Sequence, residues 1–176
     1  MNSQAPQAEV SIERAAPEHL ADIAALAAVI WHAHYPGIIS HEQIDYMLAR
    51  MYDVAVMRRE LETGIAYDRL LLNGTLRGFA SYGPAADAGE AKLHKLYIHP
   101  DSQRQGFGAM LLQHFESVAR SHGFTQVILA VNRKNEKAIA AYQKHGFKIR
   151  EAVVADIGGG GQRRSPPVKL AGIGCR

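Results

Sequence analysis

Up to residue 64, the apolar side chains recur every three or four residues, which is the period of amphipathic helices. A first helix is predicted between Pro17-Glu18 and Pro36-Gly37, with its apolar face at Leu20, Ile23, Leu26, Ala27 and Ile30. Two further helices are predicted, one from about Glu42 to Met51 and one from Val56 to Leu61. The N-terminal part of the chain is therefore expected to be mainly helical.

Beyond residue 64, the apolar side chains alternate with polar ones or form short continuous runs, both of which are typical of strands. Asn73-Gly74 tolerates the positive φ angles of a tight hairpin, so it predicts a turn between two strands. Helical periodicity returns over residues 106–122 and 136–145. Strands are expected over residues 10–14, 66–72, 76–82, 91–99, 127–131 and 147–157. This order of elements predicts an α/β fold with a mixed central sheet.

The chain has 176 residues, of which 47% are hydrophobic and 21% are charged, and this balance fits one globular domain, placed at residues 1–157. No apolar run approaches the roughly 20 residues that cross a bilayer, so no membrane-spanning segment is expected. The polar residues 1–9 carry no secretory signal, and one cysteine excludes an intrachain disulfide. A cytoplasmic location is therefore the expectation.

The net charge of +3 does not indicate a nucleic-acid partner, because it comes from the C-terminal segment. Residues 158–176 hold four of the 20 basic residues and no acid, which leaves 16 basic and 17 acidic residues elsewhere. A nucleic-acid-binding domain is expected to carry its basic residues on folded elements. The glycines of 158–161 and Pro166-Pro167 are poor strand material, so we expect an irregular or displaced terminus in which only Val168–Ile173 suits a strand.

A candidate anion-binding loop, Gln103-Arg104-Gln105-Gly106-Phe107-Gly108, lies between a predicted strand and the first turn of a predicted helix. The first amides of a helix lack an intrahelical acceptor and carry partial positive charge, so they converge on an anion such as a diphosphate. The third glycine of the dinucleotide fingerprint and the lysine of a Walker loop are both absent. Taken alone, the loop fits a tight connection equally well.

A second motif runs from Asn135 to Phe147 with the pattern Asn-x-x-Ala-x-x-x-Tyr-x-x-x-Gly-Phe. Its Asn135, Ala138 and Tyr142 share one helix face. Together with Lys92–Pro100 and the glycine loop, this motif resembles the acetyl-CoA-dependent N-acetyltransferases of the GNAT superfamily. The stretch from Tyr35 to Leu48 is similar to a bacterial subgroup of that family that includes polyamine acetyltransferases. The resemblance is densest from Ala91 to Phe147.

The resemblance implies a mostly antiparallel sheet with splayed strands, and acetyl-CoA as co-substrate. It implies that the backbone of Leu96, Tyr97 and Ile98 pairs with the pantetheine arm and that Asn135 binds on the cofactor side. It assigns the cofactor's diphosphate to the amides from about Arg104 to Ala109. The cofactor-binding residues of this loop are then Gln103, Arg104, Gln105, Gly106, Phe107, Gly108 and Ala109. Homodimers are common in such families, although no contact surface can be identified from the sequence.

Acetyl transfer to an amine needs a base and an acid. An amine with a pKa near 10 is only about 0.1% neutral at pH 7, so it must lose a proton before it attacks. Relatives often carry a glutamate where this chain has Lys92, and His94 on the same strand face is the predicted base; a solvated histidine or a water route is the alternative. Tyr142 is the predicted acid that protonates the leaving thiolate, and the alternative is a tyrosine that fills a gap between helix and sheet.

No metal site is predicted, because His32 and His34 are two residues apart on a helix and no other set has ligand spacing. Glu42 and Asp45 are candidates to attract a cationic acceptor, although ordinary exposed acids on a helix are the favoured explanation. The predicted activity is transfer of acetyl to a primary amine of a small molecule, with a polyamine as one candidate, by direct attack in a ternary complex. Two alternatives stay open: a non-catalytic acyl-CoA-binding sensor, and an acetyltransferase that acts on a protein or peptide amine.

Overall fold

The computed structural model describes residues 8–37, 39–132, 135–152 and 167–172. The chain forms two compact units, each built from two stretches of sequence. Unit 1 comprises Met1–Tyr82 with Lys95–Phe115, and unit 2 comprises Gly83–His94 with Glu116–Arg176. Strand β4 (Glu90–Ile98) and helix α4 (Phe107–Ser121) each contribute residues to both units.

Unit 1 begins with a strand and three helices, as the hydrophobic pattern predicts. Its elements are β1 (Val10–Arg14), η1 (Pro17–His19), α1 (Leu20–His34), α2 (His41–Tyr52), α3 (Val54–Glu62), β2 (Ala66–Leu72), most of β3 (Thr75–Pro84), the end of β4, η2 (Pro100–Ser102) and the start of α4. The strands follow the order β1-β2-β3-β4, and the first two ladders are antiparallel. Asn73 and Gly74 have φ angles of 50° and 75°, which confirms the predicted hairpin turn.

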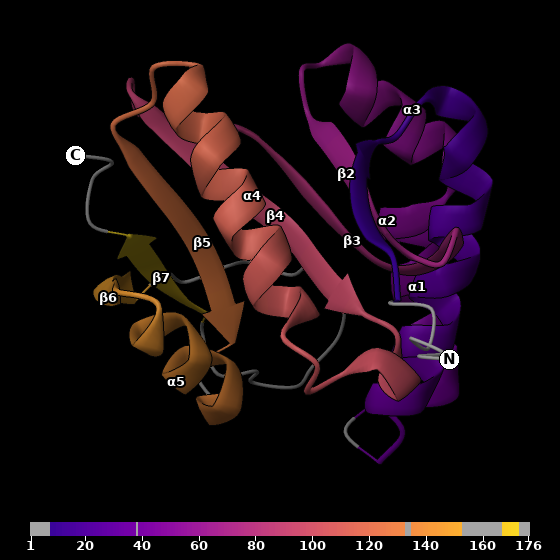
Figure 1. Cartoon of the computed structure of the whole chain (residues 1–176). Helices are drawn as coiled ribbons and strands as arrows, with labels where there is room; N and C mark the ends of the chain where they lie inside the picture. The colour runs from indigo at the N-terminus through magenta and orange to yellow at the C-terminus, as the bar shows by residue number, and fades with distance from the viewer. Residues whose placement is uncertain (1–7, 38, 133–134, 153–166, 173–176) are drawn as a thin grey trace, which may run out of the picture. The chain divides into compact units, whose positions relative to one another are not determined.

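The core of unit 1 lies between helices α1–α3 and one face of β2 and β3 (Figure 1). Fully buried members from each element include Ile23, Ile44, Met57, Tyr67 and Phe79. The opposite face of the same strands packs against α4, where the rings of Tyr82 and Phe115 lie 4.9 Å apart. Both faces of these strands are therefore covered.

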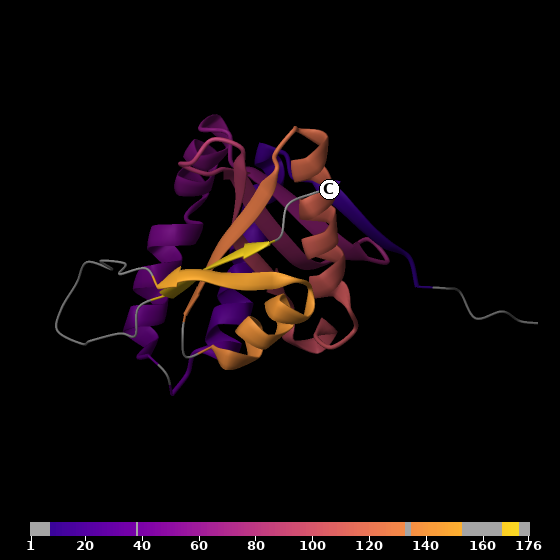
Figure 2. The ribbon, with the colours of Figure 1, turned by 90° about the vertical axis from the view of Figure 1, so that its left-hand side faces the viewer.

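Unit 2 contains the start of β4, the end of α4, β5 (Gln126–Asn132), α5 (Glu136–Lys144), β6 (Phe147–Ala152) and β7 (Pro167–Gly172). The strand order is β4-β5-β7-β6; the β4–β5 pair is parallel and the other two pairs are antiparallel. Figure 2 shows β7 lying beside β6. Val127, Ile128 and Leu129 are all buried, as the unbroken apolar run predicts. The predicted fold class, a mixed and mostly antiparallel sheet with flanking helices, is confirmed.

Residues 167–172 agree with the expectation that, in the C-terminal segment, only Val168–Ile173 suits a strand, whereas the irregular course expected for residues 158–166 lies outside the described residues. Residues 167–172 form a regular strand inserted between β5 and β6, where both edges offer hydrogen-bond partners to its backbone. Pro167 is tolerated because it is the first residue of the strand. Residues 153–166, which hold the end of the predicted strand 147–157 and the glycine run, lie outside the described residues. No helix in the described part of the chain is long and apolar enough to cross a membrane.

Candidate active site

Strand β4 continues beyond its pairing with β5. The parallel ladder joins Glu90–Leu93 to Gln126–Leu129, whereas β4 runs on to Ile98. On the edge away from β3, residues 95–98 therefore have no strand partner among the described ladders. Backbone N–H and C=O groups on such an edge can pair with an extended ligand as if it were an added strand. This is the stretch in which Leu96, Tyr97 and Ile98 are predicted to contact pantetheine.

Gly78 of β3 allows β4 to lie close to β3 at this stretch. A Cβ at Gly78 would lie 2.6 Å from Ile98 Cδ1 and 3.0 Å from the Tyr97 carbonyl oxygen. The first contact is too short and would require the Ile98 side chain to turn away, and the second is tight enough that the backbone at Tyr97 would have to shift by a few tenths of an ångström. Sequence reasoning gave this glycine no role, because its constraint comes from a neighbouring strand.

The loop after β4 turns sharply into α4. Arg104 and Gly106 have positive φ angles of 62° and 83°, and the Gln103 side chain donates to the Ile98 carbonyl at 3.3 Å. The Met110 amide donates to the Gly106 carbonyl at 3.0 Å. The amides of residues 107–109 therefore have no acceptor within the helix, and they carry the positive end of its dipole. The loop and the open strand edge belong to the same unit and are continuous in sequence.

Gly108 is not required by packing within the protein. A Cβ at Gly108 would lie 3.8 Å from Leu96 Cδ2 and 3.9 Å from Ile98 Cγ1, which are ordinary contacts. The side chains of Gln103, Arg104 and Gln105 are exposed, while Phe107 is buried and anchors the first turn of α4. In the predicted anion-binding loop, no side chain therefore covers the backbone amides at Gly106 and Gly108, and the buried Phe107 holds the first turn of the following helix in place.

The other predicted site residues, His94, Asn135 and Tyr142, lie in unit 2. Tyr142 is half-buried, its ring lies 5.7 Å from that of Phe147, and burial raises its pKa above the ordinary value of 10.0. Asn135 caps α5, because its side-chain oxygen accepts from the Ala138 amide at 3.2 Å. His94 is exposed on β4, between the buried Leu93 and Lys95. The assigned chemical roles of these residues stay predictions.

A buried ion pair on the α1–α3 side of unit 1 was not predicted. Lys95 is 5% exposed and donates to Glu60 Oε1 at 3.1 Å and to Oε2 at 2.7 Å; it also bonds the Tyr67 hydroxyl. Burial lowers the pKa of Lys95, and the hydrogen bond and charge of Glu60 oppose that shift. The sequence did hold a signal for this pair. Residues two apart on a strand share a face, so Lys95 lies on the same face as the apolar Leu93, and a lysine buried on that face needs a partner for its charge.

The model of the acetyltransferase (GNAT) family matches residues 25–147, more than two thirds of the chain. This chain is a member of the GNAT family. It is an acetyltransferase whose acetyl donor is acetyl-CoA.

Relatives of this GNAT acetyltransferase act on several amines. A spermidine N(1)-acetyltransferase of Thermoplasma acidophilum is 26% identical over 84% of this chain and 94% of that protein. A ribosomal protein bS18-alanine N-acetyltransferase of Escherichia coli is 37% identical over 45% of this chain and 52% of that protein. The crystal structure of PaiA N-acetyltransferase from T. acidophilum, in complex with coenzyme A, aligns with a TM-score of 0.78 at 24% identity, covering 94% of this chain and 99% of that one.

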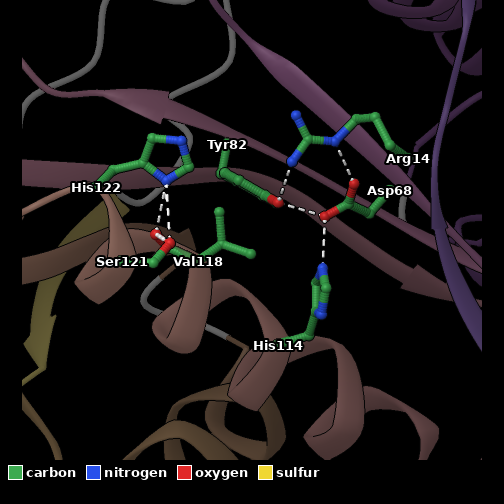
Figure 3. Close-up of polar contacts among 7 residues, drawn as sticks. All are labelled: Arg14, Asp68, Tyr82, His114, Val118, Ser121 and His122. Carbon is green, nitrogen blue, oxygen red and sulfur yellow. Dashed lines mark hydrogen bonds and ion pairs between the residues drawn. The ribbon is translucent and has the colours of Figure 1, made fainter.

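In this GNAT acetyltransferase, a buried carboxylate connects α4 to the strands of unit 1 (Figure 3). Asp68 is 1% exposed and accepts from Arg14 Nε at 2.6 Å and from the Tyr82 hydroxyl. Its Oδ2 lies 3.0 Å from Nε2 of His114 on α4. The cluster Arg14–Asp68–Tyr82–His114 thus holds the helix that begins at the glycine loop. Sequence reasoning missed it because its members are far apart in the chain.

Proposed function

We propose that this acetyltransferase moves the acetyl group of acetyl-CoA to a primary amine of a small molecule, by direct attack in a ternary complex. The observation that carries the proposal is the continuous stretch 95–109, which joins an open strand edge to a helix N-terminus. In this proposal the pantetheine arm pairs along residues 96–98, and the amides of residues 104–109 hold the diphosphate.

The proposed chemistry removes two protons from the nitrogen, one before it attacks the carbonyl and one as the amide forms, and it delivers one proton to the sulfur; the other proton leaves to solvent. The incoming ammonium must be deprotonated before it attacks, and His94 is assigned this step, directly or through water. When the C–S bond breaks, the Tyr142 hydroxyl protonates the departing sulfur. Burial raises the pKa of Tyr142, so the phenol carries its proton at neutral pH, but the same shift makes it a weaker acid toward the thiolate; the assignment therefore rests on the resemblance and not on the pKa. The cytoplasmic location, the homodimer and a cofactor contact by Asn135 stay predictions.

A second candidate is transfer to the N-terminal amine of a protein. It is supported by the E. coli relative that modifies an alanine of a ribosomal protein and is 37% identical over 79 residues. The match covers less than half of this chain, whereas the spermidine acetyltransferase aligns over 84% of it. The small-molecule acceptor is therefore the first proposal.

The deciding experiment incubates the purified protein with acetyl-CoA and single amines, and follows release of the CoA thiol. Polyamines, aminoglycosides, amino acids and peptides form the panel, and mass spectrometry identifies the acetylated product. We expect thiol release only when an accepted small amine is present. Saturable binding of acetyl-CoA without thiol release from any amine would contradict the proposal and favour a sensor.

A further inference from the structure

The open strand edge of β4 is anchored by side chains on both faces of the sheet. Leu96 and Ile98 lie near Gly108 on the α4 face. Lys95 and Tyr97 alternate with them along the strand, so they lie on the opposite face, where Tyr97 packs against the core formed with helices α1–α3. Because this stretch has a strand neighbour on one edge only, its position depends on these side chains.

The Lys95 ammonium connects this strand edge to three other elements. It donates to both carboxylate oxygens of Glu60 on α3, at 2.7 and 3.1 Å, and to the hydroxyl of Tyr67 on β2. It also lies 5.2 Å from the ring centroid of Tyr52 on α2 and 5.0 Å from that of Tyr67. Tyr67 in turn donates to Glu60, so the ammonium, the phenol and the carboxylate all bond one another. The first residue of the open edge is therefore tied to α2, α3 and β2.

Stability alone does not explain why an ion pair is buried here. The Lys95 side chain is 5% exposed and that of Glu60 is 32% exposed, so folding removes most of the water around the ammonium. Replacing such a pair with packed apolar side chains is often neutral or stabilising. Leu93, buried on the same face of β4, shows that an apolar residue is accommodated there. What the pair adds is direction, because hydrogen bonds have preferred angles whereas apolar burial has none.

A small displacement of this edge would matter to a ligand that pairs with it. The N–H and C=O groups of residues 96–98 follow Lys95 directly along the backbone, so a shift at Lys95 moves them as well. An N–H···O bond is made over a narrow range of distance, roughly 2.7 to 3.2 Å. In catalysis, a misplacement of about 1 Å can lower a rate about 10²-fold. An anchor that fixes Lys95 therefore controls how well an extended arm pairs along the edge.

We propose that Lys95 and Glu60 are positioning residues for the acetyl donor: their ion pair holds residues 96–98 where the backbone can pair with the pantetheine arm. This inference rests on the function proposed above, in which the arm pairs along this edge. Neither side chain touches the donor, and both act through the backbone of β4. Without the pair, the amides at the start of α4 still hold the diphosphate, but the arm loses its alignment with the strand.

The experiment compares two ligands, of which one lacks the arm. CoA carries both the diphosphate and the pantetheine arm, whereas adenosine 3′-phosphate 5′-diphosphate carries the diphosphate without the arm. The ratio of their affinities, measured by calorimetric titration, reports what the arm contributes. In Lys95→Met, which keeps most of the apolar stem, we expect this ratio to fall about tenfold, with the affinity for the nucleotide within about twofold of wild type. Binding of the nucleotide also shows that the loop of the variant is folded.

A double-mutant cycle tests whether the two side chains act as a pair. Glu60→Gln keeps a hydrogen-bond acceptor but removes the charge, and the double variant Lys95→Met/Glu60→Gln leaves neither charge behind. We expect the double variant to lower the affinity ratio no further than Lys95→Met does. It should also unfold at a urea concentration no lower than that of Glu60→Gln alone, in which the buried ammonium lacks its counter-ion. Glu62→Gln, at an exposed acid of the same helix, is the matched control.

The same measurements can overturn the inference in three ways. A wild-type affinity ratio in Lys95→Met would show that the pair does not position the arm. Equal losses for both ligands, in the single and double variants alike, would show that the pair only stabilises the fold. Additive effects of the two substitutions would show that they do not act together. If the arm adds nothing to the affinity of the wild-type protein, the proposed use of this edge fails, and the inference fails with it.

Discussion

At two positions beside β4, Gly78 and Gly108, different partners restrict the addition of a side chain. At Gly78, the space is occupied by Ile98 and by the backbone of Tyr97, so the constraint comes from the protein. At Gly108, the nearest atoms are at ordinary contact distance, so nothing in the chain itself requires a glycine. In the proposed function, the constraint at Gly108 comes from the bound diphosphate.

The matched substitutions Gly78→Ala and Gly108→Ala separate these reasons. Gly78→Ala is expected to lower the free energy of unfolding by about 1–3 kcal/mol through overpacking. Gly108→Ala is expected to leave it unchanged or slightly higher, and to weaken acetyl-CoA binding at least about tenfold. Urea unfolding and calorimetric titration with acetyl-CoA measure the two effects. Full acetyl-CoA affinity in Gly108→Ala would argue against a diphosphate at this position.

Tyr142→Phe tests the proposed proton donor. The variant keeps the ring against Phe147 but cannot protonate the leaving thiolate, so kcat is expected to fall about 10²-fold or more. KM for acetyl-CoA is expected to change little. Because burial raises the pKa of Tyr142, the wild-type rate should not lose this acid between pH 7 and 9. Stopped assays of acetylated product measure kcat of the variant and the pH dependence of the wild-type rate, with Tyr46→Phe, at an exposed tyrosine of α2, as the control. An unchanged kcat in Tyr142→Phe would show that Tyr142 is not the proton donor.

Among the elements, those with strong periodicity were predicted well. The pattern at Leu20, Ile23 and Ile30 located α1, and Asn73-Gly74 located the β2–β3 hairpin. Strand β7 was harder, because its neighbours β5 and β6 supply the ladders that hold it. The glycine loop was found because its constraint is local. The Lys95–Glu60 ion pair and the Asp68 contacts were missed, because they join side chains from separate elements.

The cluster around Asp68 is expected to hold α4 in place. Asp68→Asn removes the charge that Arg14 and His114 share, and both partners are partly exposed, so we expect a loss of about 2 kcal/mol in the free energy of unfolding. The same variant should weaken acetyl-CoA binding, because the loop begins the helix that His114 anchors.

The matched control for Asp68→Asn is Glu13→Gln, which removes an exposed pairing to Arg69 at 3.0 Å. An exposed ion pair of this kind contributes at most about 1 kcal/mol. Urea unfolding and acetyl-CoA titration compare the two variants. If Asp68→Asn were as stable as Glu13→Gln, the cluster would not be holding the helix.

At the scale of the whole molecule, buried phenols determine how stability responds to alkaline pH. Burial raises the pKa of Tyr52, Tyr67, Tyr82 and Tyr97 above the ordinary value, with carboxylates adding to the shift at Tyr67 and Tyr82. In the unfolded chain these groups titrate near 10. Above that pH, the folded protein binds more protons than the unfolded chain, so the free energy of unfolding falls as pH rises.

The expected result is a steep loss of stability between about pH 10 and pH 11, with each phenol contributing up to about 1.4 kcal/mol per pH unit. Urea unfolding across this range measures the loss, and ultraviolet absorbance reports phenolate formation. The absorbance of these four residues should rise together with unfolding. Their gradual ionisation in a protein that stays folded would contradict the burial that the structure gives them.

The position of β7 also affects when the chain can finish folding during synthesis. β7, the last strand of the described residues, lies between β5 and β6, so neither neighbour can complete its hydrogen bonds until residues 167–172 have left the ribosome. A nascent chain that has emerged only as far as β6 exposes two strand edges, which are sites for aggregation or chaperone binding. Unit 2 is therefore expected to become protease-resistant only after translation of its final strand.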